Sequence, residues 1–303
     1  MGKMLDCNHY HAVFTIPNEL NKYYQRNKRV FIGIFFEAVK ETIMGMCSNI
    51  NFLGGEPGVI ASMQTWGSTM IEHIHCHCLV TAGGVTENGK WVECKKGYLF
   101  PVNENGAMGV YRAKFLWKLR NAIFKGKINL FKGLCRAKAL SEIEKLSKKE
   151  WHIHIEEQYR TGKGVLKYLA GYVKGGPIGN SRIKKYNGEK VIFTYKNSHK
   201  ERKEEEMELS VDEFIRRVLN HVPERDTKMV RYWGIYSSYK KEELAELQKV
   251  MGKIEEKVEI EEAKCKRCNG HLNYKGEITG KRNIRKLIIK MEKERRDKLK
   301  EAV

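Results

Sequence analysis

Three histidines at alternate positions of a short apolar segment are the residues of this chain best suited to chemistry. They are His73, His75 and His77. Alternate side chains of a β-strand point to the same face, so in a strand the three imidazoles lie together, with about 6.6 Å between successive Cα atoms. Two histidines at this spacing can hold one metal ion. The residues that alternate with them are Ile74, Cys76 and Cys78, which leaves the opposite face apolar and able to pack on a core.

A catalytic divalent ion fits this histidine face better than a structural zinc ion. Cys76 and Cys78 point away from the histidines in a strand, so a mixed Cys/His tetrahedral site would require the strand to be broken. One histidine in a strand is more often a core or surface residue. Three histidines on one face gain little from their proximity unless they share a partner such as a metal ion. A face open to water and phosphate oxygens suits a catalytic cation.

A second chemical element lies about 90 residues further on, where Tyr168 and Tyr172 fall in an expected helix at residues 163–174 that ends before Gly175-Gly176-Pro177. The two rings would lie on one side of that helix, about 6 Å apart along its axis. Tyrosines beside an apolar stripe are usually core-edge residues. Beside a metal site, however, a phenol can attack a phosphate that the cation polarises, and the phosphotyrosine product conserves the bond energy for rejoining.

The charge balance points to a polyanionic partner. The chain has 303 residues, 57 Lys and Arg against 37 Asp and Glu, and a net charge of +20. Nucleic acid is the simplest such partner. A membrane segment is not expected, because no apolar run approaches about 18 residues and no signal peptide opens the chain. The eight cysteines are scattered, so we expect reduced thiols in a cytoplasm.

The elements expected to position these residues are strands separated by helices and hairpins, which favours an α+β fold over a doubly wound parallel sheet. Ala82-Gly83-Gly84 is expected to be a turn, and residues 91–100 a hairpin or an arm. Strands are expected at residues 9–16, 59–66, 73–80 and 151–155, with a strand pair at 181–185 and 191–195 around Asn187-Gly188. Helices are expected at residues 18–48, 108–148 (two helices), 163–174, 209–222 (with Ser210 as N-cap) and 240–262.

Together these motifs resemble the HUH endonucleases, and among them the two-tyrosine transposases of rolling-circle insertion sequences. The resemblance rests first on His75-Cys76-His77, on Gly83-Gly84 and on Tyr168-x-x-x-Tyr172. It covers roughly residues 9 to 240. Further segments in the order of the family lie at residues 11–17, 64–67, 111–116, 177–182, 212–217 and 231–235.

The resemblance implies a ferredoxin-like antiparallel sheet, with the histidine strand central and the tyrosine helix packed beside it. We expect a single-strand nuclease domain over residues 1–237 with a helical insertion at about 105–148. Residues 238–303 are then a charged helical tail with a CxxC turn. Cys265 and Cys268 in that turn resemble half a zinc knuckle, and the alternatives are a structural Zn²⁺ or two reduced thiols.

The resemblance also implies Mg²⁺ or Mn²⁺ held by His75, His77 and a third polar side chain. For the third ligand we favour Gln64, which precedes His75 by eleven positions and stands where we expect a histidine in relatives. An amide oxygen is an acceptable ligand for a hard cation. His11 and His73 remain the alternatives.

The expected function is that of a transposase that nicks and rejoins single-stranded DNA through a 5′-phosphotyrosine formed on Tyr168 or Tyr172. Its partners would be the single-stranded DNA of element ends and target, in the bacterial cytoplasm at the nucleoid, and a homo-oligomer is left open. A rolling-circle replication initiator with the same chemistry and a non-catalytic DNA-binding relative are the alternatives. Basic helices at residues 112–138 and 281–300 are candidate DNA contacts, and Trp66, Trp91 and Tyr111 are either base-stacking or core residues.

Three departures from the family pattern affect these expectations. Relatives carry a Cys-rich zinc-binding segment before the first strand, where this sequence has only Cys7, so recognition of DNA ends is expected to be lost or supplied by another protein. Cys76 replaces an aliphatic residue between the two histidines and can still be buried. Gly171 stands where relatives often have Arg, which removes one phosphate contact.

Overall fold

The protein is described from a computed structural model that covers residues 4–94, 104–159, 175–197, 200 and 202–252. The chain divides into two units, Met1–Glu255 and Glu256–Val303, and the second unit lies outside the described residues. The expected domain boundary at residue 237 stays a prediction. None of the described helices combines the length and the apolar character needed to cross a membrane.

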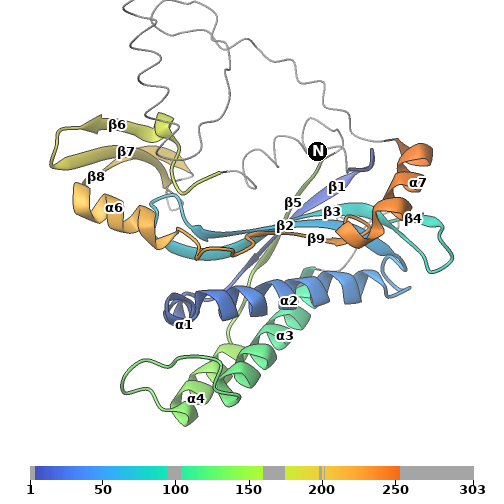
Figure 1. The fold of residues 1–303 in the computed structure, drawn as a ribbon, viewed down its shortest axis with the longest axis horizontal. Coiled ribbons are helices and arrows are strands. Elements are labelled where there is room, and N and C mark those ends of the chain that lie inside the picture. The colour runs from blue at the N-terminus through green and yellow to red at the C-terminus, as the bar shows by residue number, and fades with distance from the viewer. Residues whose placement is uncertain (1–3, 95–103, 160–174, 198–199, 201, 253–303) are drawn as a thin grey trace, which may run out of the picture. The chain divides into compact units, whose positions relative to one another are not determined.

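The main sheet is antiparallel and has the histidine strand at its centre (Figure 1). Its strand order is β5-β1-β3-β2-β9, and β4 pairs with the end of β3. Four of these strands form a ferredoxin-like core. Numbered by their order in the sequence, β1, β2, β3 and β5 are its first to fourth strands, and they lie across the sheet in the order 4-1-3-2, so the predicted fold class is confirmed. The bounds are β1 His9–Thr15, β2 Glu56–Trp66, β3 Glu72–Val85, β4 Trp91–Glu93, β5 Ile153–Tyr159 and β9 Val230–Gly234.

Helices cover the sheet face that carries Cys76 and Cys78 (Figure 1). Both sulfur atoms are fully buried, together with Phe14 of β1, Phe35 of α2 and Phe115 of α3. This burial confirms the expected apolar side of the histidine strand. The helices are α1 Asn21–Arg26, α2 Lys28–Cys47, α3 Glu104–Phe124 and α4 Arg136–Ser147.

The helix expected over residues 18–48 is interrupted at Asn27. The side-chain amide of Asn27 donates to the carbonyl oxygens of Tyr23 and Asn129, and its oxygen accepts from the Asn129 amide at 2.7 Å. These bonds hold the buried Asn27 outside helical geometry, because its side chain serves backbone groups of a distant loop.

Tyr111 is a core residue and not a base-stacking residue. It is fully buried on α3, with ring centroids 5.1 Å from Phe14 and 5.4 Å from Trp151. Burial raises the pKa of its phenol well above the usual value.

The expected turn at Ala82-Gly83-Gly84 is wrong, because β3 runs on to Val85. Gly83 pairs with Glu93 of β4, and Gly84 pairs with both β4 and β2. A Cβ atom at Gly83 would lie 2.5 Å from the Trp91 ring, and one at Gly84 would lie 2.8 Å from the Glu56 carbonyl. The two glycines therefore serve close packing inside the sheet instead of a chain reversal.

A second, smaller sheet follows in the sequence, with strand order β6-β7-β8. The predicted hairpin at Asn187-Gly188 joins β6 to β7, and Gly188 has the positive φ of +95° that such a turn requires. The predicted N-cap is also confirmed, since the Ser210 hydroxyl accepts from the Glu213 amide at 3.3 Å. The bounds are β6 Ile183–Tyr186, β7 Lys190–Asn197, β8 Lys203–Ser210 and α6 Val211–Asn220.

The last described helix, α7 Lys241–Met251, packs against the β9 end of the main sheet. Its Leu244 is buried with Leu5, Ile235 and Tyr236. The Tyr236 hydroxyl lies 2.7 Å from Nε2 of buried His9, so this small core also anchors the start of β1.

We predict opposite effects on stability for alanine at two glycines. Gly234 has φ +60° and an added Cβ would lie 1.8 Å from the Pro57 carbonyl oxygen, so Gly234→Ala should lower the free energy of unfolding by more than about 2 kcal/mol. Gly33 on α2 has no atom within 4 Å of the added Cβ, so Gly33→Ala should raise it by up to about 1 kcal/mol. Urea denaturation measures both, and equal effects would contradict the assignment of strain to Gly234.

Candidate active site on the histidine face of the sheet

The register of β3 brings polar side chains of its two neighbours beside the histidines. His75 stands opposite Gln64 of β2 and Thr15 of β1, and His77 stands opposite Ser62 of β2. Directly opposed residues of antiparallel strands share one face, with Cβ atoms about 4.5–5.5 Å apart. Gln64 is thus adjacent to His75, on the face opposite to the one that packs against α2 and α3.

His75 is held in the tautomer that a metal ligand needs. Its Nδ1 lies 2.7 Å from the His73 carbonyl oxygen, which can only accept, so Nδ1 carries the proton and Nε2 carries the lone pair. Within the described part of the chain no partner is recorded for that Nε2 atom. The ring centroids of His75 and His77 are 4.7 Å apart, so both imidazoles can address one point.

His11 supports His77 from the neighbouring strand. Nε2 of His11 lies 2.9 Å from Nδ1 of His77, and the two rings stack with centroids 5.1 Å apart. One of these nitrogens donates to the other. When His77 is the donor, its Nε2 is left with the lone pair, which is the arrangement of a ligating histidine and its orienting partner.

Burial keeps both imidazoles neutral. Desolvation lowers the pKa of His75 to about 4. It lowers the pKa of His77 to about 2, with further contributions from the nearby rings of His75, His11 and His73. Both groups therefore carry no charge at neutral pH, and neutral imidazole is the form that binds a cation.

Among the described residues, no group of three or more His, Cys, Asp and Glu side chains is placed to hold a metal ion. The set His75, His77 and Gln64 combines two imidazoles with one amide, and all three side chains are buried on the same face. Imidazole and amide oxygen together suit a divalent cation such as Mg²⁺ or Mn²⁺, so the donors present fit the expected ion.

The predicted nucleophiles Tyr168 and Tyr172, and the predicted zinc ligands Cys265 and Cys268, lie outside the described residues. The description resumes at Gly175, three positions after Tyr172. Gly175 lines a cavity of about 270 Å³ whose wall also includes Ser62, the residue opposite His77. The other residues of this wall are mostly apolar: Met63, Trp66, Gly176, Pro177, Val218, His221, Val222, Pro223, Met229 and Val230.

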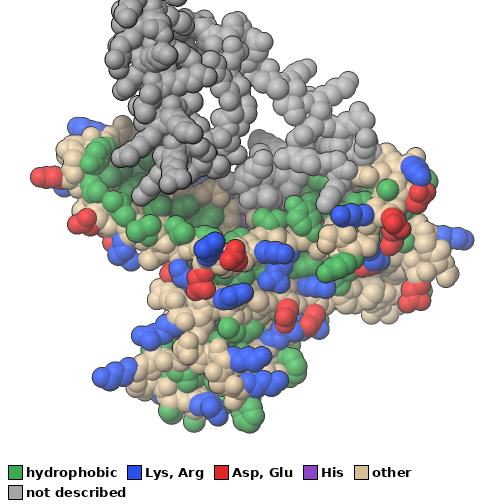
Figure 2. Space-filling view, viewed as in Figure 1, with side chains coloured by type: hydrophobic (Ala, Val, Ile, Leu, Met, Phe, Trp, Pro, Cys, Tyr) green, Lys and Arg blue, Asp and Glu red, His purple; other side chains and the backbone are tan. Residues whose placement is uncertain are grey.

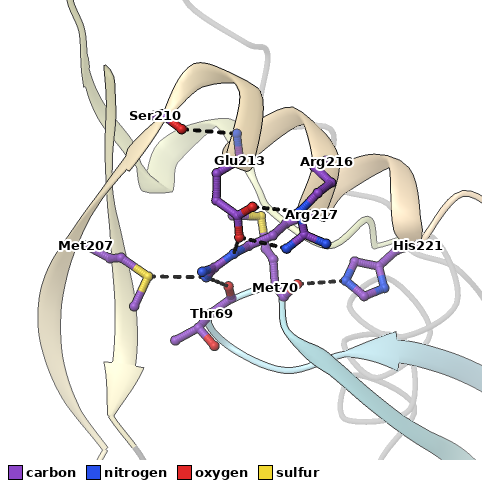
Figure 3. A network of polar contacts seen from close by, with 8 residues as sticks. All are labelled: Thr69, Met70, Met207, Ser210, Glu213, Arg216, Arg217 and His221. Carbon is purple, nitrogen blue, oxygen red and sulfur yellow. Dashed lines mark hydrogen bonds and ion pairs between the residues drawn. The ribbon is translucent and has the colours of Figure 1, made fainter. Parts of the chain in front are cut away.

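A histidine that the sequence did not single out fixes the turn between β2 and β3 (Figure 3). Nε2 of buried His221 donates to the Met70 carbonyl at 2.9 Å, so its Nδ1 accepts from the Thr65 hydroxyl at 3.0 Å. Thr65 follows Gln64 directly, and Met70 has a φ of +59°, which is unusual for a residue other than glycine. The ring of Trp66 meets that of His221 edge-on at 5.8 Å.

Two arginines hold the same turn. Arg217 donates from Nη1 to the Thr69 carbonyl at 3.1 Å, while its Nε binds Glu213 at 2.7 Å (Figure 3). Arg182 donates to the Ser68 carbonyl. Together with His221, these side chains bind three successive carbonyls of the turn, at Ser68, Thr69 and Met70. The second sheet and α6 therefore position the segment that joins Gln64 to His73.

The chain is similar to known transposases over most of its length. The family model Y2_Tnp, described as "Putative transposase", matches residues 58–243, which is more than half of the chain. "Putative transposase y4qJ" of Sinorhizobium fredii is 30% identical over 260 residues, which cover 83% of this chain and 64% of that protein. The "Transposase for insertion sequence element IS801" of Pseudomonas savastanoi pv. phaseolicola is 27% identical over 245 residues, covering 78% of this chain and 56% of that protein.

The chain thus spans less than two thirds of the length of these two relatives. Among solved structures, the N-terminal origin-recognition/nickase domain of non-structural protein 1 from human bocavirus aligns with a TM-score of 0.32 at 11% identity. That alignment covers 55% of this chain and 74% of the viral chain.

We predict that His221→Leu destabilises the protein by about 1–3 kcal/mol, because it removes the donor to the buried Met70 carbonyl and leaves the Thr65 hydroxyl with its bond to Tyr24 alone. The matched control is His152→Leu, since His152 is exposed, and it should change stability by less than about 0.5 kcal/mol. Chemical denaturation monitored by tryptophan fluorescence measures both variants. A His221→Leu protein as stable as the wild type would show that the turn does not depend on this side chain.

Proposed function

The chain belongs to the Y2_Tnp family of transposases, and from this membership we propose that it nicks and rejoins single-stranded DNA, using a tyrosine nucleophile and a divalent cation at the histidine face. The observation that carries the proposal is the arrangement of His75 and His77. Both are neutral and buried, their ring centroids are 4.7 Å apart, and each has a partner that orients its ring. We place the reaction in the bacterial cytoplasm, at the nucleoid.

We assign the cation to His75, His77 and Gln64, with Mg²⁺ or Mn²⁺ as the ion. When bound, such an ion acts as a Lewis acid on a phosphate oxygen. The His73 carbonyl and the His11 ring keep the two ligating rings in orientation, and Gln64 offers its amide oxygen from β2. His11 is better placed as an orienting partner of His77 than as the third ligand, and His73 is the exposed member of the row.

The nucleophile in this proposal is Tyr168 or Tyr172. Its phenol oxygen loses a proton and forms a bond to the scissile phosphorus, the bond from phosphorus to the 3′-oxygen breaks, and that oxygen takes up a proton and leaves as a 3′-hydroxyl. The 5′-phosphotyrosine that results has the bond needed for a later attack by a 3′-hydroxyl. Three residues of chain span at most about 11 Å, and Gly175 lies at the cavity beside the histidine face, which supports a tyrosine acting there.

Two further assignments belong to this proposal. The DNA partners are the single-stranded ends of the element and its target. Cys265 and Cys268 contribute to a structural zinc site or remain reduced thiols. The six cysteines that the structure describes are free thiols.

We predict a covalent protein–DNA adduct that needs both the tyrosines and the cation. The protein is incubated with labelled single-stranded DNA from the flanks of its own gene, with Mg²⁺ or with EDTA, and resolved on a denaturing gel. The adduct should form only with Mg²⁺ and disappear in the Tyr168→Phe, Tyr172→Phe double variant. Tyr186→Phe, at an exposed tyrosine of β6, is the control and should retain it. An undiminished adduct in the double variant would refute the assignment of the nucleophile.

A second prediction separates Gln64 from its alternatives as third ligand. Gln64→Ala should raise the Mn²⁺ concentration for half-maximal cleavage by about 10–100-fold, and Gln64→Glu should restore it to within a few-fold, because a carboxylate keeps the oxygen donor. Thr15→Ala alters the other cross-strand neighbour of His75 and should have little effect. If His73→Ala shifts the Mn²⁺ dependence and Gln64→Ala does not, His73 is the third ligand.

A further inference from the structure

The helices α3 and α4 lie on the side of the main sheet opposite to the histidine face (Figure 1). The sheet side chains that pack against α3 are those of Phe14, Cys76 and Cys78, which alternate with the histidine row. A surface on the outer side of α3 and α4 is therefore separated from the candidate active site by the sheet and its core.

Half of the net charge of the protein is concentrated in this short region. Residues 112–149 contain 12 Lys and Arg but only two acidic residues, Glu142 and Glu144, a surplus of ten positive charges out of twenty for the whole chain. Figure 2 shows Lys and Arg side chains over this part of the molecule with apolar side chains between them.

Much of this charge is not neutralised by neighbouring carboxylates. Lys114 and Lys118 form ion pairs with Glu37 and Glu41 of α2, which tie α3 to α2. Arg120 pairs with Glu144, and Lys149 pairs with Glu19. Five further cations of this region are exposed and form no ion pair within the described residues. They are Lys125, Lys127, Lys132, Arg136 and Lys138.

Two large aromatic side chains of α3 are also exposed. Trp117 is 64% exposed and Phe124 is 68% exposed. Seven residues of helix bring them to the same side of α3, about 10.5 Å apart along its axis. Beside Trp117 a groove of about 510 Å³ runs between α3 and α4, lined by Arg112 and by Arg120, whose guanidinium pairs with Glu144 in the same wall.

We propose that this surface, formed by Trp117, Phe124 and the five exposed cations, binds a second segment of single-stranded DNA. Unpaired bases stack on the two rings, and the phosphates contact the cations. A duplex offers no open base faces to projecting rings, so the aromatic residues favour a single strand. The inference rests on the proposed function, because a reaction that rejoins strands must retain one segment while another occupies the histidine face.

The test compares two variants of the full chain with a charge-matched control. Trp117→Ala with Phe124→Ala removes the rings, and Lys125→Gln with Lys127→Gln and Lys132→Gln removes three cations. Lys40→Gln with Lys90→Gln and Lys241→Gln removes the same charge from exposed sites elsewhere. Binding of labelled oligo(dT) of about 12 and about 40 nucleotides is measured by fluorescence anisotropy at several salt concentrations, and adduct formation is measured on a saturating short cleavage substrate.

We expect the aromatic variant to bind the long oligonucleotide at least about 10-fold more weakly, with little change for the short one. The lysine variant should reduce the slope of log K against log salt by about 2, which corresponds to three lost phosphate contacts, while the scattered control reduces it by less than about 0.5. Both surface variants should form the adduct at the wild-type rate, because their positions are remote from the histidine face.

Equal losses in the lysine variant and the scattered control would overturn the proposal, because they would reflect net charge alone. Unchanged binding in the aromatic variant together with loss of a wild-type dimer in sedimentation would also overturn it and assign the surface to a second copy of the chain. If the wild type forms no adduct, the proposed function fails, and the oligo(dT) data still decide separately whether the surface binds single-stranded DNA.

Discussion

The candidate site depends on the strict alternation of side chains along β3. Cys76 and Cys78 are fully buried in the core on one face, while His75 and His77 stand on the other. A slip of one residue in register would exchange the two faces and place the imidazoles in the apolar core beside Phe14, Phe35 and Phe115, so the register is strongly specified. Pairing with β1 on one side and β2 on the other holds it, and both pairings also supply polar neighbours, His11 and Gln64.

The ends of the same strands are fixed by a different kind of interaction. The turn that joins β2 to β3 leaves three carbonyls pointing toward α6 and the second sheet, and Arg182, Arg217 and His221 each bind one of them. The Met70 carbonyl is buried and requires such a partner, while the bonds to Ser68 and Thr69 lie nearer the surface, so α6 and the second sheet hold this turn in place. Glu213 contributes indirectly: its carboxylate binds Arg217, and its backbone amide donates to the hydroxyl of the N-cap residue Ser210 (Figure 3). The turn that follows Gln64 is thus held by residues more than 100 positions away in the sequence.

Local patterns predicted the histidine strand, its two faces, the Asn187-Gly188 hairpin and the Ser210 cap, because each is determined by neighbours within a few residues. The contacts of His11 with His77 and of His221 with Thr65 were not predictable, since no periodicity relates positions 66 and 156 residues apart. Gly83-Gly84 was misread because glycine marks turns and close packing equally well. Strand β8 was missed because its four glutamates disfavour strands, and it forms only through pairing with β7.

The sheet also separates two demands that conflict electrostatically. The imidazoles of His75 and His77 are neutral because burial lowers their pKa values. A dense positive charge beside them would repel the cation that the site is proposed to bind. The surplus of ten positive charges in residues 112–149 lies with α3 and α4, on the other side of the sheet from the histidines. The exposed lysines there repel one another and destabilise the free protein slightly, so a polyanion that binds them also stabilises the fold. The sheet thus keeps the proposed cation site apart from the proposed polyanion surface.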